Sequence, residues 1–150
     1  MKYLVTGGAG FIGSHIARTL LEQGQTVRIM DNFSTGKREN IVVLTQQFGR
    51  DQLEIMEGDV RDASRVKEAV AGIEIIFHEA AFVSVPQSMQ EPQECFDINL
   101  TGTFITANAA ARHMLAHGGG SIVLIASVGG AGGGSGGAAR LGPGGESHSS

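Results

Sequence analysis

The sequence predicts an α/β fold in which a doubly wound parallel sheet carries helices on both faces. Three observations predict it. Short β-rich runs alternate with amphipathic helical segments, glycines cluster directly after the first run, and the last run is apolar throughout, as in a buried parallel strand. Because crossover connections are right-handed, we expect the strand order 3-2-1-4-5, with a ligand crevice between strands one and four.

The first half of the chain contains three predicted strands and two predicted helices. The run KYLVT at 2–6 is β-rich and ends in glycines, and residues 11–23 have helical apolar spacing that Gly24 ends. A second strand follows at 26–30, then the turn-forming residues DNFSTG at 31–36 and a helix over 38–48. The third strand is expected at 53–56, where Gly58 and Asp59 close it.

The second half continues the alternation as far as residue 127. We expect a helix over 63–71, a fourth strand at 74–78, a long helix over 94–117 and a fifth strand at 121–126. The pattern then stops, since residues 128–150 hold 10 of the 23 glycines and only two large aliphatic residues. Such a segment buries too little surface to offset its ordering entropy. The sequence therefore predicts a domain over 1–127, truncated after strand five, and a Gly/Ser-rich disordered tail over 128–150.

Composition excludes several function classes. The formal net charge is -4 and no lysine- or arginine-rich run occurs, so a nucleic-acid surface is not expected. No segment approaches the ~20 apolar residues that span a bilayer, and the apolar run at 1–6 is too short for a signal peptide. Cys95 is the only cysteine, which excludes an internal disulfide. We expect a cytoplasmic protein without membrane contact and without a bound metal.

The glycine loop after the first strand predicts a dinucleotide site. Gly7, Gly10 and Gly13 follow the spacing G-x-x-G-x-x-G between a strand and a helix, which is the context that this motif requires. The first glycine permits a tight turn, the second lets the backbone approach a pyrophosphate, and the third lets the helix pack on the strand. Backbone N–H groups near Phe11 and Ile12 then bind phosphate, helped by the helix dipole. The fold is accordingly of the Rossmann type.

Asp31 indicates which dinucleotide binds. It ends the second strand 18 residues after Gly13, where a carboxylate accepts hydrogen bonds from both adenosine ribose hydroxyls. A carboxylate also repels a 2′-phosphate, so we expect NAD rather than NADP. Lys37 and Arg38 lie close enough in sequence to weaken that exclusion.

Asp59 is a candidate for adenine binding. Its side chain could reach the adenine amino group, with the Val60 backbone against the ring edge. The alternative is a helix cap for the segment that starts near Ala63, for which Asp62 is the better candidate.

Four separated motifs then resemble one known family. The stretches LVTGGAGFIGSH, DNFSTGKREN, GDVRD and FHEAAFVSVPQSMQEP, together covering about residues 1–103, resemble the extended short-chain dehydrogenases/reductases. Within that family they are similar to the epimerases and dehydratases that act on nucleotide sugars. The resemblance implies a recycled NAD, which accepts a hydride from a sugar hydroxyl and returns it to the ketone. It also implies a UDP- or dTDP-hexose substrate, and it allows a homodimer through two helices, one of them matching 94–117.

The resemblance assigns roles residue by residue. Phe11 and Ile12 would contact the pyrophosphate, and Asp59 and Val60 the adenine. The adenosine ribose would be held within 31–36, by Asp31, Asn32, Ser34, Thr35 and Gly36. After strand four the cofactor would be lined by Ala80, Ala81 and Phe82.

Three further residues are weighed against the same resemblance. Asn99 matches an asparagine that supports the site, the alternative being a helix-surface residue. His78 is expected to be a packing residue at the end of a strand, and Glu79 occupies a variable position with no assigned role.

From Asn99 onward the chain is more similar to single-domain short-chain reductases. In both groups a serine just after strand five hydrogen-bonds the reacting hydroxyl, and Ser127 matches it as the catalytic candidate. The acid/base pair Tyr-x-x-x-Lys of the family is absent, because the only tyrosine is Tyr3 and no lysine follows Lys67. The change of composition at 128 resembles a truncation, a shifted reading frame or an artificial tail. We therefore expect an NAD-binding domain that is inactive as this chain, the alternatives being an NAD(P)-dependent reductase fragment or a non-catalytic NAD sensor.

Overall fold

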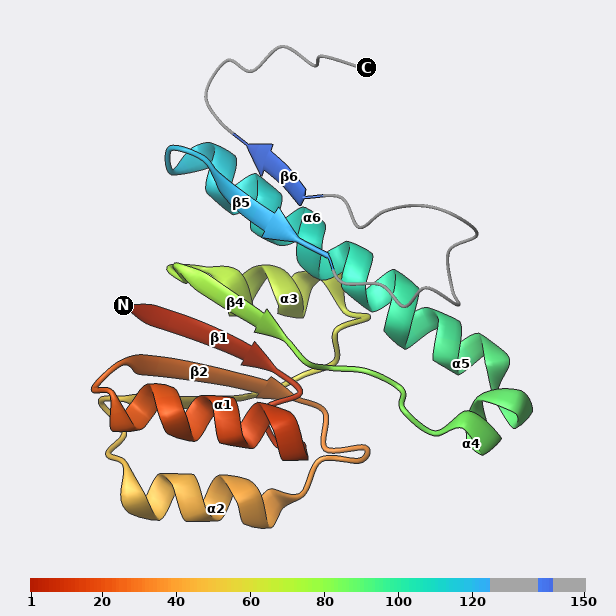
Figure 1. Cartoon of the computed structure of the whole chain (residues 1–150), viewed down its shortest axis with the longest axis horizontal. Helices are drawn as coiled ribbons and strands as arrows, with labels where there is room; N and C mark the ends of the chain where they lie inside the picture. Colours follow the sequence, from red (N-terminus) through yellow and green to blue (C-terminus); the bar gives the residue numbers. More distant parts are fainter. Residues whose placement is uncertain (125–137, 142–150) are drawn as a thin grey trace. The chain divides into compact units, whose positions relative to one another are not determined.

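The computed structural model describes residues 1–124 and 138–141, which fall into two compact units, Met1–Ala109 and Ala110–Ser150. The first unit holds most of the secondary structure (Figure 1). Its elements, in chain order, are β1 (Lys2–Thr6), α1 (Phe11–Glu22), β2 (Thr26–Asp31), α2 (Arg38–Gln47), β3 (Leu53–Glu57), α3 (Ala63–Val70), β4 (Ile75–His78), α4 (Val85–Gln90), α5 (Pro92–Phe96), the π-helix η1 (Asp97–Gly102) and the first part of α6 (Thr103–Ala116).

The four strands of this unit form one parallel sheet in the order β3-β2-β1-β4. Successive side chains of a strand point to opposite faces, and the core divides accordingly. Val5 lies in a cluster with residues of α1 and α2, whereas Leu4 lies in a cluster with residues of α3. The predicted doubly wound fold and the order 3-2-1-4 are therefore confirmed, and the element bounds differ from the predicted ones by about one residue.

The fifth strand is where the predicted topology is wrong. β5 (Gly120–Val123) pairs antiparallel with β6 (Ala138–Leu141) in a separate two-stranded sheet. The sequence places residues 138–141 in a disordered tail, whereas in the structure this glycine-free run AARL pairs with the edge of β5. Residues 125–126 of the predicted strand, and the other tail residues, lie outside the described part of the chain.

The segment between β4 and β5 also differs from the prediction. The helix expected over 94–117 is three consecutive pieces, α5, η1 and α6, and α4 was not predicted. The signal for α4 is a capping sequence, because the Ser84 side chain accepts a hydrogen bond from the Gln87 N–H at 3.4 Å. Gly102 closes η1 where a Cβ would lie 2.7 Å from Cγ2 of Val60, so the close approach of this helix requires glycine.

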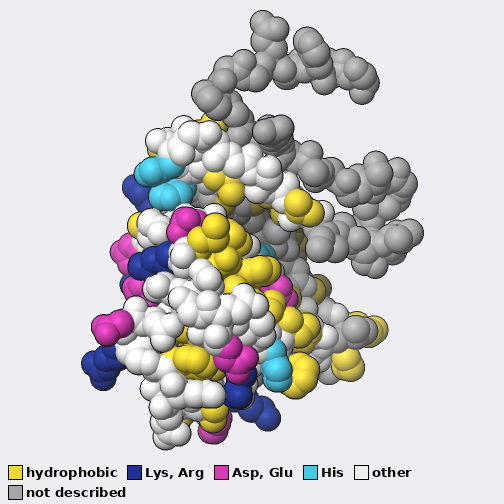
Figure 2. All heavy atoms as spheres, turned by 60° about the vertical axis from the view of Figure 1, so that its left-hand side comes forward, with side chains coloured by type: hydrophobic (Ala, Val, Ile, Leu, Met, Phe, Trp, Pro, Cys, Tyr) yellow, Lys and Arg dark blue, Asp and Glu magenta, His cyan; other side chains and the backbone are white. Residues whose placement is uncertain are grey.

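On the face drawn in Figure 2, acidic and basic side chains are interspersed, and neither charge forms a continuous patch. Ion pairs such as Arg65–Glu68, at 2.8 Å, account for part of this mixing. Within residues 1–124 and 138–141, no helix is both long and apolar enough to cross a membrane.

Candidate functional site

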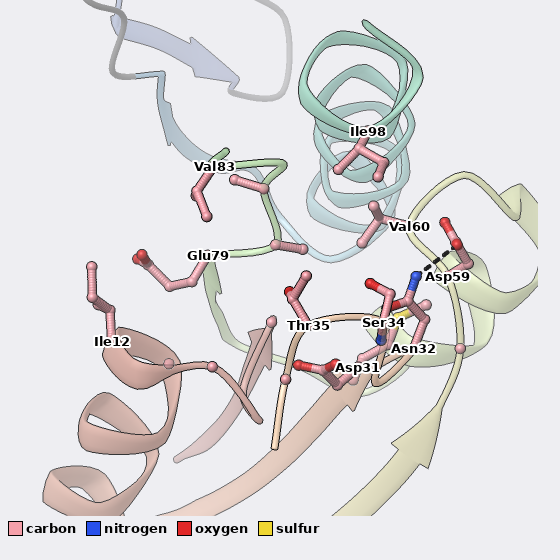
Figure 3. A pocket seen from close by; sticks show the side chains of 18 of the residues that line it. Ile12, Asp31, Asn32, Ser34, Thr35, Asp59, Val60, Glu79, Val83 and Ile98 are labelled. Atoms are coloured by element: carbon pink, nitrogen blue, oxygen red, sulfur yellow. Dashed lines mark hydrogen bonds between the residues drawn. The ribbon is translucent and has the colours of Figure 1, made fainter. Parts of the chain in front are cut away.

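A cavity of about 400 Å³ lies at the carboxyl edge of the four-stranded sheet, where the loops after all four strands meet (Figure 3). This is the edge at which open α/β sheets bind ligands. All but two of the predicted cofactor residues line it: Gly7, Gly10, Phe11, Ile12, Gly13, Asp31, Asn32, Ser34, Thr35, Gly36, Asp59, Val60, Ala80 and Ala81.

The glycine loop has the geometry that the motif predicts. Gly7 has a φ of +67°, so its conformation favours glycine, and its N–H donates to the Met30 carbonyl at 2.8 Å. At Gly13 a Cβ would lie 2.3 Å from the Gly7 carbonyl oxygen, which only glycine avoids. Helix α1 begins after Gly10 without a side-chain cap. Its first N–H groups, including those of Phe11 and Ile12, therefore remain available for a phosphate at the cavity.

Asp31 holds the glycine loop against β2 as well as facing the cavity. Its carboxylate accepts the Ala9 N–H at 2.9 Å and the Phe33 N–H at 2.8 Å, one on each oxygen. The side chain is buried, with the residue 8 % exposed. Since each carboxylate oxygen accepts more than one hydrogen bond, acceptor capacity is left for ribose hydroxyls.

The nearby cation Arg38 contacts Phe33 and Glu57. Its guanidinium lies 4.0 Å from the centroid of the Phe33 ring and pairs with the Glu57 carboxylate at 3.1 Å. Arg38 would have to leave the exposed pair with Glu57 to reach a 2′-phosphate.

Asp59 is a saturated acceptor in this structure. One oxygen accepts the backbone N–H and Nε of Arg61, each at 2.9 Å, and the other accepts Arg61 Nη2 at 2.7 Å and Asn32 Nδ2 at 2.9 Å. Hydrogen bonds from Arg61 hold the pKa of the Asp59 carboxyl far below its usual range. A bond to an adenine amino group would have to displace one of these donors. The competing cap role is excluded, because Asp62 caps α3 as predicted.

Two predicted residues, Phe82 and Asn99, lie beside the cavity rather than in its lining. The Phe82 N–H donates to Oδ1 of Asn99 at 2.7 Å, and Nδ2 of Asn99 donates to the Phe82 carbonyl at 3.0 Å. The carboxamide thus fastens the loop after β4 to the π-helix η1. This paired contact supports the rim that Ala80 and Ala81 provide.

A hydrogen-bonded relay through His78 ties the same loop to β1. The Thr103 hydroxyl donates to the Asn99 carbonyl at 2.7 Å, so its oxygen accepts from Nε2–H of His78 at 3.3 Å. Nδ1 of His78 then accepts the Thr6 hydroxyl at 2.8 Å, and Thr6 accepts the Ala80 N–H at 3.4 Å. Each donor and acceptor is satisfied only by the neutral Nε2–H tautomer.

Burial of the His78 imidazole makes folding pH-dependent. Burial lowers the pKa of His78, whereas the unfolded chain protonates near the ordinary value of about 6.5. The unfolded state therefore binds more protons below that pH, and stability should fall by up to about 1.4 kcal/mol per pH unit until the folded-state pKa is reached. Urea denaturation of the unsubstituted chain and of His78→Gln, from pH 7.5 to 5.0, measures it. The stability difference between the two should shrink as the pH falls; parallel curves would contradict the relay.

The sequence analysis does not predict several residues of the lining, although each lies next to a predicted site residue or to the end of a strand. Met30 and Gly58 flank the predicted Asp31 and Asp59, and Glu79 directly follows the last residue of β4. Glu79, to which the sequence assigns no role, therefore lies in the lining of the cavity. Val83 and Ile98 come from the loop after β4 and from η1, the two segments that the Phe82–Asn99 hydrogen bonds join. Ser127, the predicted catalytic residue, lies outside the described residues.

Comparison with known proteins shows the family to which this chain belongs. The family model for GDP-mannose 4,6 dehydratase matches residues 4–127. The chain belongs to this family. It is therefore a member of the NAD-dependent epimerases and dehydratases among the short-chain dehydrogenases/reductases, as its motifs predicted. UDP-glucose 4-epimerase of Klebsiella pneumoniae is 39 % identical over 111 residues, which are 73 % of this chain and 79 % of that protein.

Longer relatives match the same region of this family member. UDP-glucose 4-epimerase of Bacillus subtilis is 36 % identical over 75 % of this chain and 34 % of its own length. The structure of the Thermus thermophilus enzyme with NAD has a TM-score of 0.65 and 37 % identity, covering 75 % of this chain and 34 % of that one. The Bifidobacterium longum enzyme, solved with NAD+ and UDP, has a TM-score of 0.69 and 31 % identity over the same shares. The chain thus spans about a third of these longer relatives.

Proposed function

We propose that this chain is the NAD-binding part of a nucleotide-sugar epimerase or dehydratase, and that it binds NAD without turning over a sugar by itself. The observation that carries the proposal is the cavity at the sheet edge. It combines the uncapped start of α1 for a pyrophosphate with the Asp31 carboxylate for an adenosine ribose. Bound NAD would supply hydride acceptance from a sugar hydroxyl.

We infer the absence of turnover because the sequence lacks the tyrosine and lysine that would transfer the proton. The only tyrosine in the sequence, Tyr3, lies near the start of β1, at the edge of the sheet opposite to the cavity. Its hydroxyl contacts Sδ of Met1 at 3.5 Å, and its ring stacks on Phe77 with centroids 6.3 Å apart. No lysine after Lys67 could lower the pKa of a catalytic tyrosine.

The substrate class of the complete activity is part of the same proposal. One solved relative, from Thermotoga maritima, was crystallised with UDP-glucose. By analogy we assign a nucleotide hexose to the enzyme type. The cytoplasm is the proposed location, because the single cysteine suits a reducing compartment.

Calorimetric titration tests the binding half of the proposal. We expect saturable binding of NAD to the unsubstituted chain, with NADP weaker because of Asp31. Incubation with NAD and UDP-galactose should yield no UDP-glucose. Absence of NAD binding would refute the cofactor role, and clear epimerase turnover would show that another residue replaces the tyrosine.

A short-chain reductase remains the second candidate, since the sequence from Asn99 onward is similar to that group. The two functions differ in what they require of the bound cofactor. A reductase consumes NADH or NADPH and releases the oxidised form, whereas an epimerase retains NAD. Stoichiometric oxidation of added NADH by a small carbonyl compound would favour the reductase.

A further inference from the structure

One charged side chain of the cavity has no assigned task. Among the described residues, the lining carries the carboxylates of Asp31, Asp59 and Glu79 and no lysine or arginine. Asp31 is held by two backbone N–H groups and Asp59 by Arg61 and Asn32. Within residues 1–124, the half-buried Glu79 carboxylate has neither a hydrogen-bond donor nor an ion-pair partner. Of the three carboxylates, Glu79 is thus the one that no group within residues 1–124 holds by a side-chain hydrogen bond or an ion pair.

The position of Glu79 along the cavity determines what its charge can act on. Asn32 and Asp59 mark one side of the cavity, and Figure 3 shows the Glu79 side chain on the other side, pointing toward Ile12 at the start of α1. A dinucleotide with its adenosine at Asp31 and its pyrophosphate at the start of α1 must extend its second nucleoside past that helix start. The nicotinamide half would then lie on the Glu79 side.

The two redox forms of the cofactor differ there by one charge. The oxidised pyridinium ring carries a positive charge and the reduced ring carries none, while the pyrophosphate and adenosine are the same in both forms. A carboxylate near the ring stabilises the oxidised form selectively, whereas a carboxylate near the pyrophosphate would weaken both forms equally.

We propose that Glu79 is a specificity-determining residue that makes this site prefer NAD+ over NADH. The inference rests on the proposed function, because it presupposes that the cavity binds the dinucleotide. It goes beyond that function by assigning redox selectivity to a single side chain. Such a preference suits an enzyme whose cofactor must be oxidised before the sugar binds.

The test is the ratio of two dissociation constants, Kd for NADH divided by Kd for NAD+, measured by calorimetry on the full chain. Glu79→Gln removes the charge and keeps the size of the side chain, so the ratio should fall about threefold to tenfold, as for unit charges several ångströms apart in a solvated cleft. Glu79→Asp keeps the charge and should retain a ratio above that of the glutamine variant. Because the Glu79 side chain has no partner within residues 1–124, both variants should keep the melting temperature of the unsubstituted chain.

Glu22→Gln is the matched control. Glu22 is exposed in the last turn of α1, at the opposite end of the helix from the cavity, so this variant removes the same charge at a distance. Its ratio should equal that of the unsubstituted chain.

Two results would overturn the proposal, and they are distinguishable from each other. If Glu79→Gln changes the dissociation constants for NAD+ and NADH equally, or changes neither, Glu79 does not interact with the charge of the nicotinamide ring. The proposed NAD binding would then still stand. Failure of the unsubstituted chain to bind either form would instead overturn the proposed function, and the present inference with it.

Discussion

Replacing Gly13 by alanine should weaken NAD binding and destabilise the fold. The added Cβ would lie 2.3 Å from the Gly7 carbonyl oxygen and 2.8 Å from Cα of Gly8, both backbone atoms that cannot rotate away. Helix α1 would have to move off the loop, at an overpacking cost of about 2–3 kcal/mol. The N–H groups at the helix start would move with it, so NAD affinity should fall by more than about tenfold.

Gly49→Ala is the control for that substitution. Gly49 has no neighbour within 4 Å of an added Cβ and no positive φ, so alanine there should be neutral or stabilise by up to about 1 kcal/mol. Urea denaturation and NAD calorimetry on both variants make the comparison. A Gly13→Ala chain that binds NAD normally would show that the loop is not the phosphate site.

Asp31→Asn should lower both stability and the preference for NAD over NADP. The amide has one acceptor oxygen, whereas the carboxylate accepts the Ala9 and Phe33 N–H groups on separate oxygens, so one buried donor loses its partner. Loss of a hydrogen bond to a charged group costs about 1.5–3 kcal/mol. Without the negative charge, NADP should no longer be repelled, and the ratio of Kd for NADP to Kd for NAD should fall by about tenfold.

The control for Asp31 is Asp51→Asn, an exposed aspartate in the loop before β3. It removes the same charge without touching the cavity, so both stability and the cofactor ratio should remain as in the unsubstituted chain. If Asp31→Asn leaves the ratio of Kd for NADP to Kd for NAD unchanged, the Asp31 charge does not determine the choice of cofactor. Lys37, the nearby cation other than the paired Arg38, would then be the residue to test.

The glycine loop and Asp31 were predictable because their signals are local. Gly7 needs a positive φ and Gly13 needs space within a turn of a few residues, so strand, glycines and helix appear together in the sequence. The same holds for β1 and β2, which are largely buried, and for the short β-rich runs of β3 and β4, which keep exposed positions. By contrast, the pairing of β5 with β6 joins residues about 20 positions apart, and no periodicity specifies such a partner.

The loop after β4 was harder to predict, since its course depends on contacts with a helix further along the chain. Glu79 lines the cavity, and the residues after it are held by the hydrogen bond from the Ala80 N–H to the Thr6 hydroxyl and by the Phe82–Asn99 pair. Asn99 was identified only from the family resemblance, and the structure gives a physical reason for it.

The paired contact between Asn99 and Phe82 has a consequence for slow opening of the protein. The side-chain amide replaces both hydrogen bonds that a neighbouring strand would offer to Phe82, so this exposed loop carries a protected backbone amide. Its proton can exchange with solvent deuterium only when the loop separates from η1. The hydrogen–deuterium exchange rate of the Phe82 amide thus reports how often this loop separates from η1, and it can be measured without any ligand.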